Sequence, residues 1–435
     1  MKVKKKKLKR IVAGFIMLIT SFNISVQAQT WTPMGQELDS TVFSLLENNG
    51  TVYAGGLFTN SIASFNGSSW TSLGSGANGN VKALTYYDGK LVAGGSFDTI
   101  SGTAANRIAV WDGTLWDTLG SGFDGQVNVL LSDTVNNLLY AAGGFNNSGI
   151  VSTKKIAVWD GVSWTALSTG MDYPIYALAI YNGVLYAGGD FDSAGGTAAF
   201  HFARWDGMNW SSVGNGSNLN VNALKVYNGE LYVAGKFSSI GGVSAKRIAK
   251  WNDISWSSVG GGFNNEVFAL NVYDNNLYAA GTFLTNNTDT IERIARWQDS
   301  VWVGVTTEGI NNTVYALASD NSNMYVGGMF SSAGGNSINN VAQLDISTSI
   351  IEPISKSGKI RLYPNPSSSW VSVNMEENES GIIRVINMSG QVINENSFSN
   401  SNKLIIDIED LPVGVYQVQV NTDNDIQCKT LIIQR

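Results

Sequence analysis

Between residues 31 and 346, short apolar segments alternate with polar segments rich in Gly, Asn and Asp. The apolar segments carry many β-branched and aromatic residues, a composition typical of strands. Leu185–Gly189 and Ile108–Trp111 are two examples. The dipeptides Asp88-Gly89 and Asn182-Gly183 separate neighbouring segments and suit two-residue hairpin turns. The pattern therefore predicts many short strands joined by tight turns.

The predicted strands repeat with a nearly constant period. Six Trp residues lie 46, 48, 46, 46 and 46 positions apart: Trp70, Trp116, Trp164, Trp210, Trp256 and Trp302. A second Trp series runs five residues ahead of the first, so that Trp111 and Trp116 are symmetric about a turn and should face each other across two strands. Each period holds four strands, which is the content of one propeller blade.

All four strand types occur seven times, but the chain opens with a fourth strand and ends the repeat with a third. We therefore expect 31–35 to supply the fourth strand of the blade whose third strand is Val341–Ile346. This pairing would close the ring and remove its open edges. The sequence predicts an all-β protein, with a seven-bladed β-propeller over residues 29–346.

The repeat resembles two groups of known propellers. Its strands follow the pattern Gly-Gly-x-Phe, then Ile-Ala-x-Trp, then Trp-x-x-Leu-Gly. This order is similar to Kelch-type repeats and to repeats of fungal cortical polarity markers. The resemblance implies the fold and leaves the activity open, because propellers host unrelated functions.

The first 28 residues have the layout of a secretory signal peptide. Seven of the first ten residues are Lys or Arg, Ile11–Ile19 is mainly apolar, and Val26-Gln27-Ala28 suits cleavage after Ala28. The apolar run is too short for a permanent membrane anchor, so we expect no transmembrane segment in the mature chain. Removal leaves 20 basic residues against 34 acidic ones, a net charge near −14. Such an acidic chain is a poor nucleic-acid binder.

The repeat stops at a Ser/Ile-rich linker, 347–358, and a different domain is expected over 359–435. About seven short alternating segments follow the linker, enough for a small Ig-like β-sandwich. Its motifs are Tyr-Pro-Asn-Pro, an Asn-x-x-Gly-Gln turn, Leu-Pro-x-Gly-x-Tyr, and a terminal apolar strand ending in Lys/Arg. The motif residues are Tyr363, Pro364, Asn365, Pro366, Gly390, Gln391, Leu411, Pro412, Gly414 and Tyr416.

These four motifs, in this order, closely resemble the type A C-terminal sorting domain of proteins exported by the type IX secretion system of Bacteroidetes. The resemblance implies recognition by the outer-membrane translocon, removal by a sortase-like processing protease, and surface attachment or release. It therefore places the protein at the outer cell surface or in the medium, reached through the periplasm. An ordinary accessory Ig-like domain is the alternative.

Residues for cofactor or metal chemistry are scarce. One His and one Cys exclude zinc or copper sites that need several such ligands. The Gly-rich stretches recur with the blade period and lack the Lys-Ser/Thr ending of a phosphate-binding loop. We therefore predict no cofactor, no metal site and no identified catalytic residue.

A ligand site is expected around the central channel, on the propeller face that carries the long loops. The candidate residues on that face are Asp124, Asp172, Tyr173, Asp190, Asp192 and Glu266. The favoured function is a non-catalytic module that binds a protein or a glycan. The alternative is a metal-free polysaccharide lyase or glycoside hydrolase that uses carboxylates on the same face.

Overall fold

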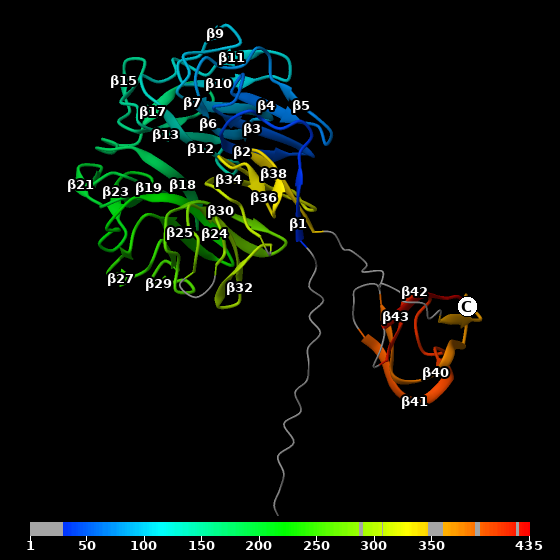
Figure 1. Ribbon diagram of the computed structural model, residues 1–435. Coiled ribbons are helices and arrows are strands. Elements are labelled where there is room, and N and C mark those ends of the chain that lie inside the picture. Colours follow the sequence, from blue (N-terminus) through cyan, green and yellow to red (C-terminus); the bar gives the residue numbers. More distant parts are fainter. Residues whose placement is uncertain (1–28, 287–289, 307, 347–359, 388–391, 423–425) are drawn as a thin grey trace, which may run out of the picture. The chain divides into compact units, whose positions relative to one another are not determined.

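The computed structural model describes residues 29–435 except 287–289, 307, 347–359, 388–391 and 423–425 (Figure 1). The described residues form strands, turns and loops, and none of them forms an α-helix. None of these residues thus belongs to a helix that could cross a membrane. The chain divides into two compact units, one ending at Ser347 and one starting at Thr348. The all-β prediction is confirmed.

The first unit contains seven antiparallel sheets of four strands. The first strands are β2 (Val42–Asn48), β6 (Val81–Tyr87), β12 (Val127–Asp133), β18 (Ile175–Tyr181), β24 (Val221–Tyr227), β30 (Val267–Tyr273) and β34 (Val314–Ser319). The second strands are β3 (Thr51–Gly56), β7 (Lys90–Gly95), β13 (Leu138–Gly143), β19 (Val184–Gly189), β25 (Glu230–Gly235), β31 (Asn276–Gly281) and β35 (Met324–Gly328).

The third strands are β4 (Ile62–Phe65), β10 (Ile108–Trp111), β16 (Ile156–Trp159), β22 (Phe202–Trp205), β28 (Ile248–Trp251), β32 (Ile294–Gln298) and β38 (Val341–Ile346). The fourth strands are β5 (Trp70–Ser72), β11 (Trp116–Thr118), β17 (Trp164–Ala166), β23 (Trp210–Ser212), β29 (Trp256–Ser258), β33 (Val301–Gly304) and β1 (Gln29–Pro33).

In five blades, the loop between the second and third strands contains a small hairpin whose two strands have two residues each. These hairpins are β8–β9 (Thr99–Ile100, Thr103–Ala104), β14–β15 (Asn147–Ser148, Val151–Ser152), β20–β21 (Ser193–Ala194, Thr197–Ala198), β26–β27 (Ser239–Ile240, Val243–Ser244) and β36–β37 (Ser332–Ala333, Asn336–Ser337).

The first strands of the seven sheets form a closed ring. Each contacts the next in the order β2, β6, β12, β18, β24, β30 and β34, and β34 contacts β2. In Figure 1 the blue β2 accordingly lies beside the yellow β34. We call each four-stranded sheet a blade and number blades 1 to 7 from β2 to β34. The ring of first strands surrounds the axis of the propeller.

Glycine lets neighbouring blades approach closely. A Cβ added to Gly55 of blade 1 would lie 2.6 Å from Cγ1 of Val81, the first residue of blade 2. Gly327 of blade 7 has the same relation, also 2.6 Å, to Val42 of blade 1. Because real Cβ atoms do not approach that closely, any larger residue there would push the blades apart. Glycine one residue before the end of the second strand therefore sets the spacing to the next blade in blades 1, 2, 4 and 7, whereas blades 3, 5 and 6 have Ala at this position.

Tryptophan links the outer parts of the blades. Trp111 and Trp116 are register partners across their turn, with ring centroids 5.3 Å apart, so the expected pairing is confirmed. The indole Nε1 of Trp116 also donates a hydrogen bond of 3.0 Å to the Leu73 carbonyl of the preceding blade. Trp164 makes the equivalent bond, 2.9 Å, to Leu119. Each bond satisfies a buried donor while it ties two blades together.

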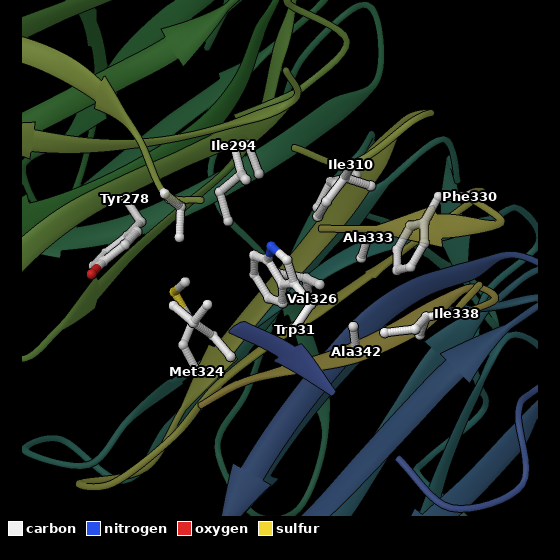
Figure 2. Close-up of a cluster of buried hydrophobic side chains, with 14 of the residues drawn as sticks. Trp31, Tyr278, Ile294, Ile310, Met324, Val326, Phe330, Ala333, Ile338 and Ala342 are labelled. Carbon is white, nitrogen blue, oxygen red and sulfur yellow. The ribbon is translucent and has the colours of Figure 1, made fainter. Parts of the chain in front are cut away.

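Blade 7 is built from both ends of the first unit. β1 pairs antiparallel with β38, from Gln29 opposite Ile346 to Pro33 opposite Ala342. Trp31 of β1 is only 2% exposed and packs among buried side chains of blades 6 and 7. Figure 2 shows its indole between Ile294, Val326 and Ala342.

The second unit is a single five-stranded sheet. Its strands are β39 (Arg361–Tyr363), β40 (Trp370–Asn387), β41 (Val392–Asp407), β42 (Gly414–Thr422) and β43 (Ile426–Ile433), ordered β39-β40-β42-β43 with β41 on β40. The register of β40 against β41 is irregular between Asn374 and Gly381, while β39 and β42 pair with opposite ends of β40. A parallel bridge from Ser367 to Ile433 joins the two ends of the sheet.

The second unit thus has five strands where the sequence predicted about seven short ones. The polar run 376–380 continues β40 in extended conformation, so that β40 is one long strand. At Gly381 an added Cβ would collide with the Asn421 carbonyl of β42, so glycine lets the neighbouring strand approach there. The result is a barrel-like sheet around one apolar core.

Candidate functional site

A β-bulge occurs at the start of every first strand. In β2 the register against β3 shifts between Val42 and Ser44, which leaves Phe43 as the extra residue. The other six first strands shift at the equivalent point. A bulge re-aims the side chain of its extra residue. The seven bulge residues are Phe43, Lys82, Asn128, Tyr176, Asn222, Phe268 and Tyr315.

All seven bulge residues line one cavity of about 500 Å³, which we call the bowl. Gln126, Asn220 and Glu266, each two residues before a bulge residue, complete its lining. The bowl lies at the mouth of the ring, at the end where the second strands run into the long loops. Its volume is in the range of small-molecule sites. The bowl therefore lies where the sequence placed a ligand site.

Aromatic and amide bulge residues lie on different sides of the bowl. Blades 6, 7 and 1 supply Phe268, Tyr315 and Phe43, which we call the aromatic arc. The Phe268 and Tyr315 ring centroids are 5.2 Å apart, and those of Tyr315 and Phe43 are 5.5 Å apart. Blades 3 and 5 supply Asn128 and Asn222, the amide arc, with Tyr176 between them. One side of the bowl is thus apolar and the other is polar.

The amide arc is held in place by the neighbouring blades. Asn128 Nδ2 donates a hydrogen bond of 3.0 Å to the Ile175 carbonyl, and its Oδ1 accepts one from Gln126. Asn222 Nδ2 donates an equivalent bond, 3.3 Å, to the Val267 carbonyl. Because these bonds fix both amides before any ligand arrives, little rotamer freedom remains to be lost on binding.

Lys82 is the cation of the bowl. Its Nζ lies 5.6 Å from the ring centroid of Phe43, within range of a cation–π contact. The side chain is half-buried, and this burial lowers the pKa of the Lys82 ammonium from its usual value. At the opposite side Glu266 forms an ion pair of 3.4 Å with Lys236. The charge of Glu266 is therefore compensated, whereas that of Lys82 faces an aromatic ring.

The six candidate residues predicted from the sequence lie in different places in the structure. Glu266 lines the bowl, but Asp190 and Asp192 are not part of its lining. Asp190 lies near enough to Tyr176 to raise the pKa of that phenol, after burial as the main cause. Tyr173 is 54% exposed and lies outside the bowl.

Asp124 and Asp172 serve the loops. Asp124 Oδ1 accepts hydrogen bonds from the backbone amides of Asn146 and Asn147, at 2.7 and 2.9 Å. Asp172 Oδ1 accepts equivalent bonds of 3.0 Å from the amides of Asp192 and Ser193. Burial raises the pKa of both carboxyls, but these amide donors outweigh it and leave the pKa below its usual value.

The same loop contact recurs around the ring with Asn as acceptor. In blade 2, Asn78 Oδ1 accepts from the amides of Asp98 and Thr99 at 2.8 and 3.0 Å. Further members are Asn218, Asn264 and Asn311. A position that alternates between Asn and Asp while keeping one geometry is explained by the fold. Asp124 and Asp172 are thus loop anchors in this structure.

Sequence reasoning missed the bulge residues because it looked for repetition. The residue before each bulge is Val or Ile and is fully buried in every blade. The bulge residue itself is Phe, Lys, Asn, Tyr, Asn, Phe and Tyr around the ring. The usable signal was therefore variation at one position inside an otherwise constant strand.

A second cavity, about 780 Å³, opens between hairpin turns at the other end of the ring. Glu47, Asp274 and Asp320 contribute carboxylates to its wall. Asp320 accepts hydrogen bonds from the Tyr325 hydroxyl at 2.7 Å and from two turn amides. Across the described ranges, no three His, Cys, Asp or Glu side chains are grouped to hold a metal ion.

The predicted sorting motifs in the second unit hold its last strand. Asn365 Nδ2 donates to the Thr430 carbonyl at 2.7 Å, and its Oδ1 accepts from the Ile432 amide at 2.8 Å. The Tyr416 hydroxyl donates to the Pro412 carbonyl at 2.9 Å, which ties the Leu-Pro-x-Gly-x-Tyr turn to β42. Gly390, Gln391 and the predicted cleavage site at Ala28 lie outside the described residues.

Comparison with known families assigns the second unit. Residues 361–434 match the family model described as a secretion system C-terminal sorting domain. Residues 88–109 and 228–252 match a β-propeller domain of unknown function. The predicted type IX sorting domain and the propeller fold are thus confirmed. The sorting domain indicates secretion to the cell surface, as the sequence predicted. It also implies interaction with the type IX machinery.

Two solved structures are similar over most of the chain. One is the extracellular domain of a putative hybrid two-component system from B. thetaiotaomicron, with 11% identity, a TM-score of 0.48, and coverage of 94% of this chain and 58% of that one. The other is the extracellular domain of a putative one-component system from the same organism, with 14% identity, a TM-score of 0.46, and coverage of 93% and 59%. This chain thus spans less than two thirds of either. No curated protein matches the sequence significantly.

Proposed function

We propose that the protein is a non-catalytic binding module of the outer cell surface, and that it binds a glycan in the bowl. The observation that carries this proposal is the variation of the seven bulge residues. The fold needs the bulge but not any one side chain on it, since four residue types occupy it. Side chains that the fold leaves free, and that meet in one cavity, are available for recognition.

A glycan suits the bowl better than a folded protein does. A pyranose ring has an apolar face of C–H groups and a rim of hydroxyls, and the bowl has an aromatic arc opposite an amide arc. The large flat rings of Phe268 and Tyr315 offer stacking surface at low entropic cost, because each has two rotatable bonds. A concave site of about 500 Å³ accommodates a short segment of a chain.

The type IX translocon and the sortase-like protease are the proposed partners of the second unit. The exposed ring of Tyr363, in the first of the four motifs, offers a surface that a receptor could contact. In this proposal the propeller carries the binding function and the sorting domain sets its location.

Binding arrays test the proposed site. The protein without residues 1–28 is applied to a glycan array and a protein array, together with a Phe268→Ala/Tyr315→Ala variant. A Met208→Ser variant serves as control, since Met208 is exposed at the turn between β22 and β23, at the end of its blade away from the bowl, and is not part of its lining. We expect glycan binding that the bowl variant loses and the control keeps. Binding that survives in the bowl variant, or binding to proteins alone, would overturn the proposal.

A further inference from the structure

The charge of Lys82 narrows the ligand class; this inference rests on the proposed glycan-binding function. We propose that the bowl binds an oligosaccharide carrying a single carboxylate, with its sugar faces on the aromatic arc and its carboxylate on Nζ of Lys82.

The first argument is placement. Lys82 belongs to blade 2 and follows directly on the aromatic arc, because Phe43 of blade 1 is its neighbour in the ring. A sugar stacked on Tyr315, whose ring is next to that of Phe43, would therefore present its substituents toward the ammonium group. The ammonium group lies over the Phe43 ring, and this cation–π contact does not neutralise its charge.

The second argument is charge compensation. Of the bowl's lining residues, Lys82 and Glu266 alone carry charge, and Glu266 already has Lys236 as its partner. In the described chain, Lys82 has an aromatic ring and no recorded carboxylate partner. A half-buried cation is destabilised by lost solvation, as the lowered pKa of Lys82 indicates. An anionic group in the bowl would restore that stabilisation, and charge-assisted hydrogen bonds are the stronger kind.

The third argument limits the ligand to one charge near the bowl. Without residues 1–28 the chain carries a net charge near −14, and Asp190 and Glu266 lie around the mouth. A polyanion would gain at Lys82 and be repelled elsewhere. The amide arc offers uncharged hydrogen-bonding groups, which suit sugar hydroxyls. The chemistry therefore fits one uronic-acid residue within an otherwise neutral chain.

Matched pairs of oligosaccharides test this inference. Each pair is a neutral tetrasaccharide and its counterpart ending in the uronic acid, in the gluco, galacto and manno series. Isothermal titration calorimetry measures each Kd for the protein without residues 1–28. The variants are Lys82→Met, which keeps the stem and removes the charge, and Lys82→Arg, which keeps the charge. Lys90→Met is the matched control, because Lys90 lies in the same blade at the hairpin-turn end and is exposed.

We expect the acidic member to bind at least tenfold tighter in one series or more. Lys82→Met should abolish that preference, whereas Lys82→Arg and Lys90→Met should retain it. Equal affinity for both members, or a preference that survives in Lys82→Met, overturns the inference and leaves the glycan function standing. If no oligosaccharide binds and the arrays are also negative, the glycan function itself fails.

Discussion

Replacing Trp31 by Ala should destabilise the propeller more than the same change at Trp70, the equivalent Trp of blade 1. Trp31 is 2% exposed, and its Nε1 donates a hydrogen bond of 3.1 Å to Thr306 Oγ1. It also lies on the only strand of blade 7 that comes from the other end of the first unit. Trp70 occupies the same position in blade 1, but it is half-buried and its Nε1 has no recorded partner in the described chain.

The magnitude follows from burial. Truncating a fully buried Trp to Ala costs about 3–5 kcal/mol, and the lost hydrogen bond adds about 1 kcal/mol. Trp70 is only half-buried and its Nε1 makes no such hydrogen bond within the described residues, so Trp70→Ala should cost about 1–2 kcal/mol. With an unfolding entropy of about 2.1 cal/mol/K per residue over roughly 300 residues, Trp31→Ala lowers Tm by about 6–10 °C and Trp70→Ala by about 2–3 °C.

Two measurements check this prediction. Calorimetry of the protein without residues 1–28 gives the two Tm shifts, and hydrogen exchange reports on β38, whose outer edge β1 covers. Exchange in β38 should accelerate in Trp31→Ala and stay unchanged in Trp70→Ala. Equal Tm shifts in the two variants, or unchanged protection of β38, would refute the reasoning that β1 closes the ring.

Three further predictions concern the loops and the second unit. Asp124→Asn should leave Tm unchanged at pH 7, while Asp124→Ala lowers stability by about 1 kcal/mol because two loop amides lose their acceptor. Since the folded-state pKa of Asp124 is depressed, the wild type should lose the stability that this carboxylate contributes as the pH falls through that pKa. Asp124→Asn should not lose it, and Tm measured from pH 5 to 2 checks both expectations. Tyr416→Phe should destabilise the second unit by about 1 kcal/mol in urea titrations, whereas Tyr363→Phe, on a 72% exposed ring, should have no effect. Deleting 360–435 should trap a folded propeller in the periplasm, and fusing that segment to another exported protein should send the fusion to the surface or medium. Cell fractionation measures where each protein is found, and export of the truncated protein would contradict the assignment of the sorting domain.

The repeated positions made the fold predictable from the sequence. Trp116 and Gly95 recur in kind because every blade has the same neighbours, and repetition is visible without a structure. The length of β40 could not be predicted from the sequence. The polar run 376–380 has the composition of a loop, and it is extended only because β40 pairs with other strands. Tertiary pairing overrides local propensity in such segments.

The sequence predicted the propeller face on which the bowl lies, but Glu266 alone among the predicted residues lines the bowl. Asp124 attracted attention as a carboxylate on the long-loop face, but its partners are amides twenty-two and twenty-three positions away. Phe43 and Lys82 look like ordinary strand residues, and only the register shift against β3 and β7 turns them into the bowl. A bulge depends on the pairing of two strands, which a single sequence does not display.

The closing of blade 7 also fixes an order of events during biosynthesis. Thr32 of β1 donates to the carbonyl of Gln343 in β38, 311 positions later in the chain. Until β38 has been synthesised, β1 has no partner and the ring cannot close, so the slowest and most aggregation-prone stage spans nearly the whole propeller. The sorting domain follows β38 in the chain. A polypeptide that ends before β38 lacks both the partner of β1 and the sorting domain. Every chain that carries the signal for crossing the outer membrane is therefore long enough to complete the ring.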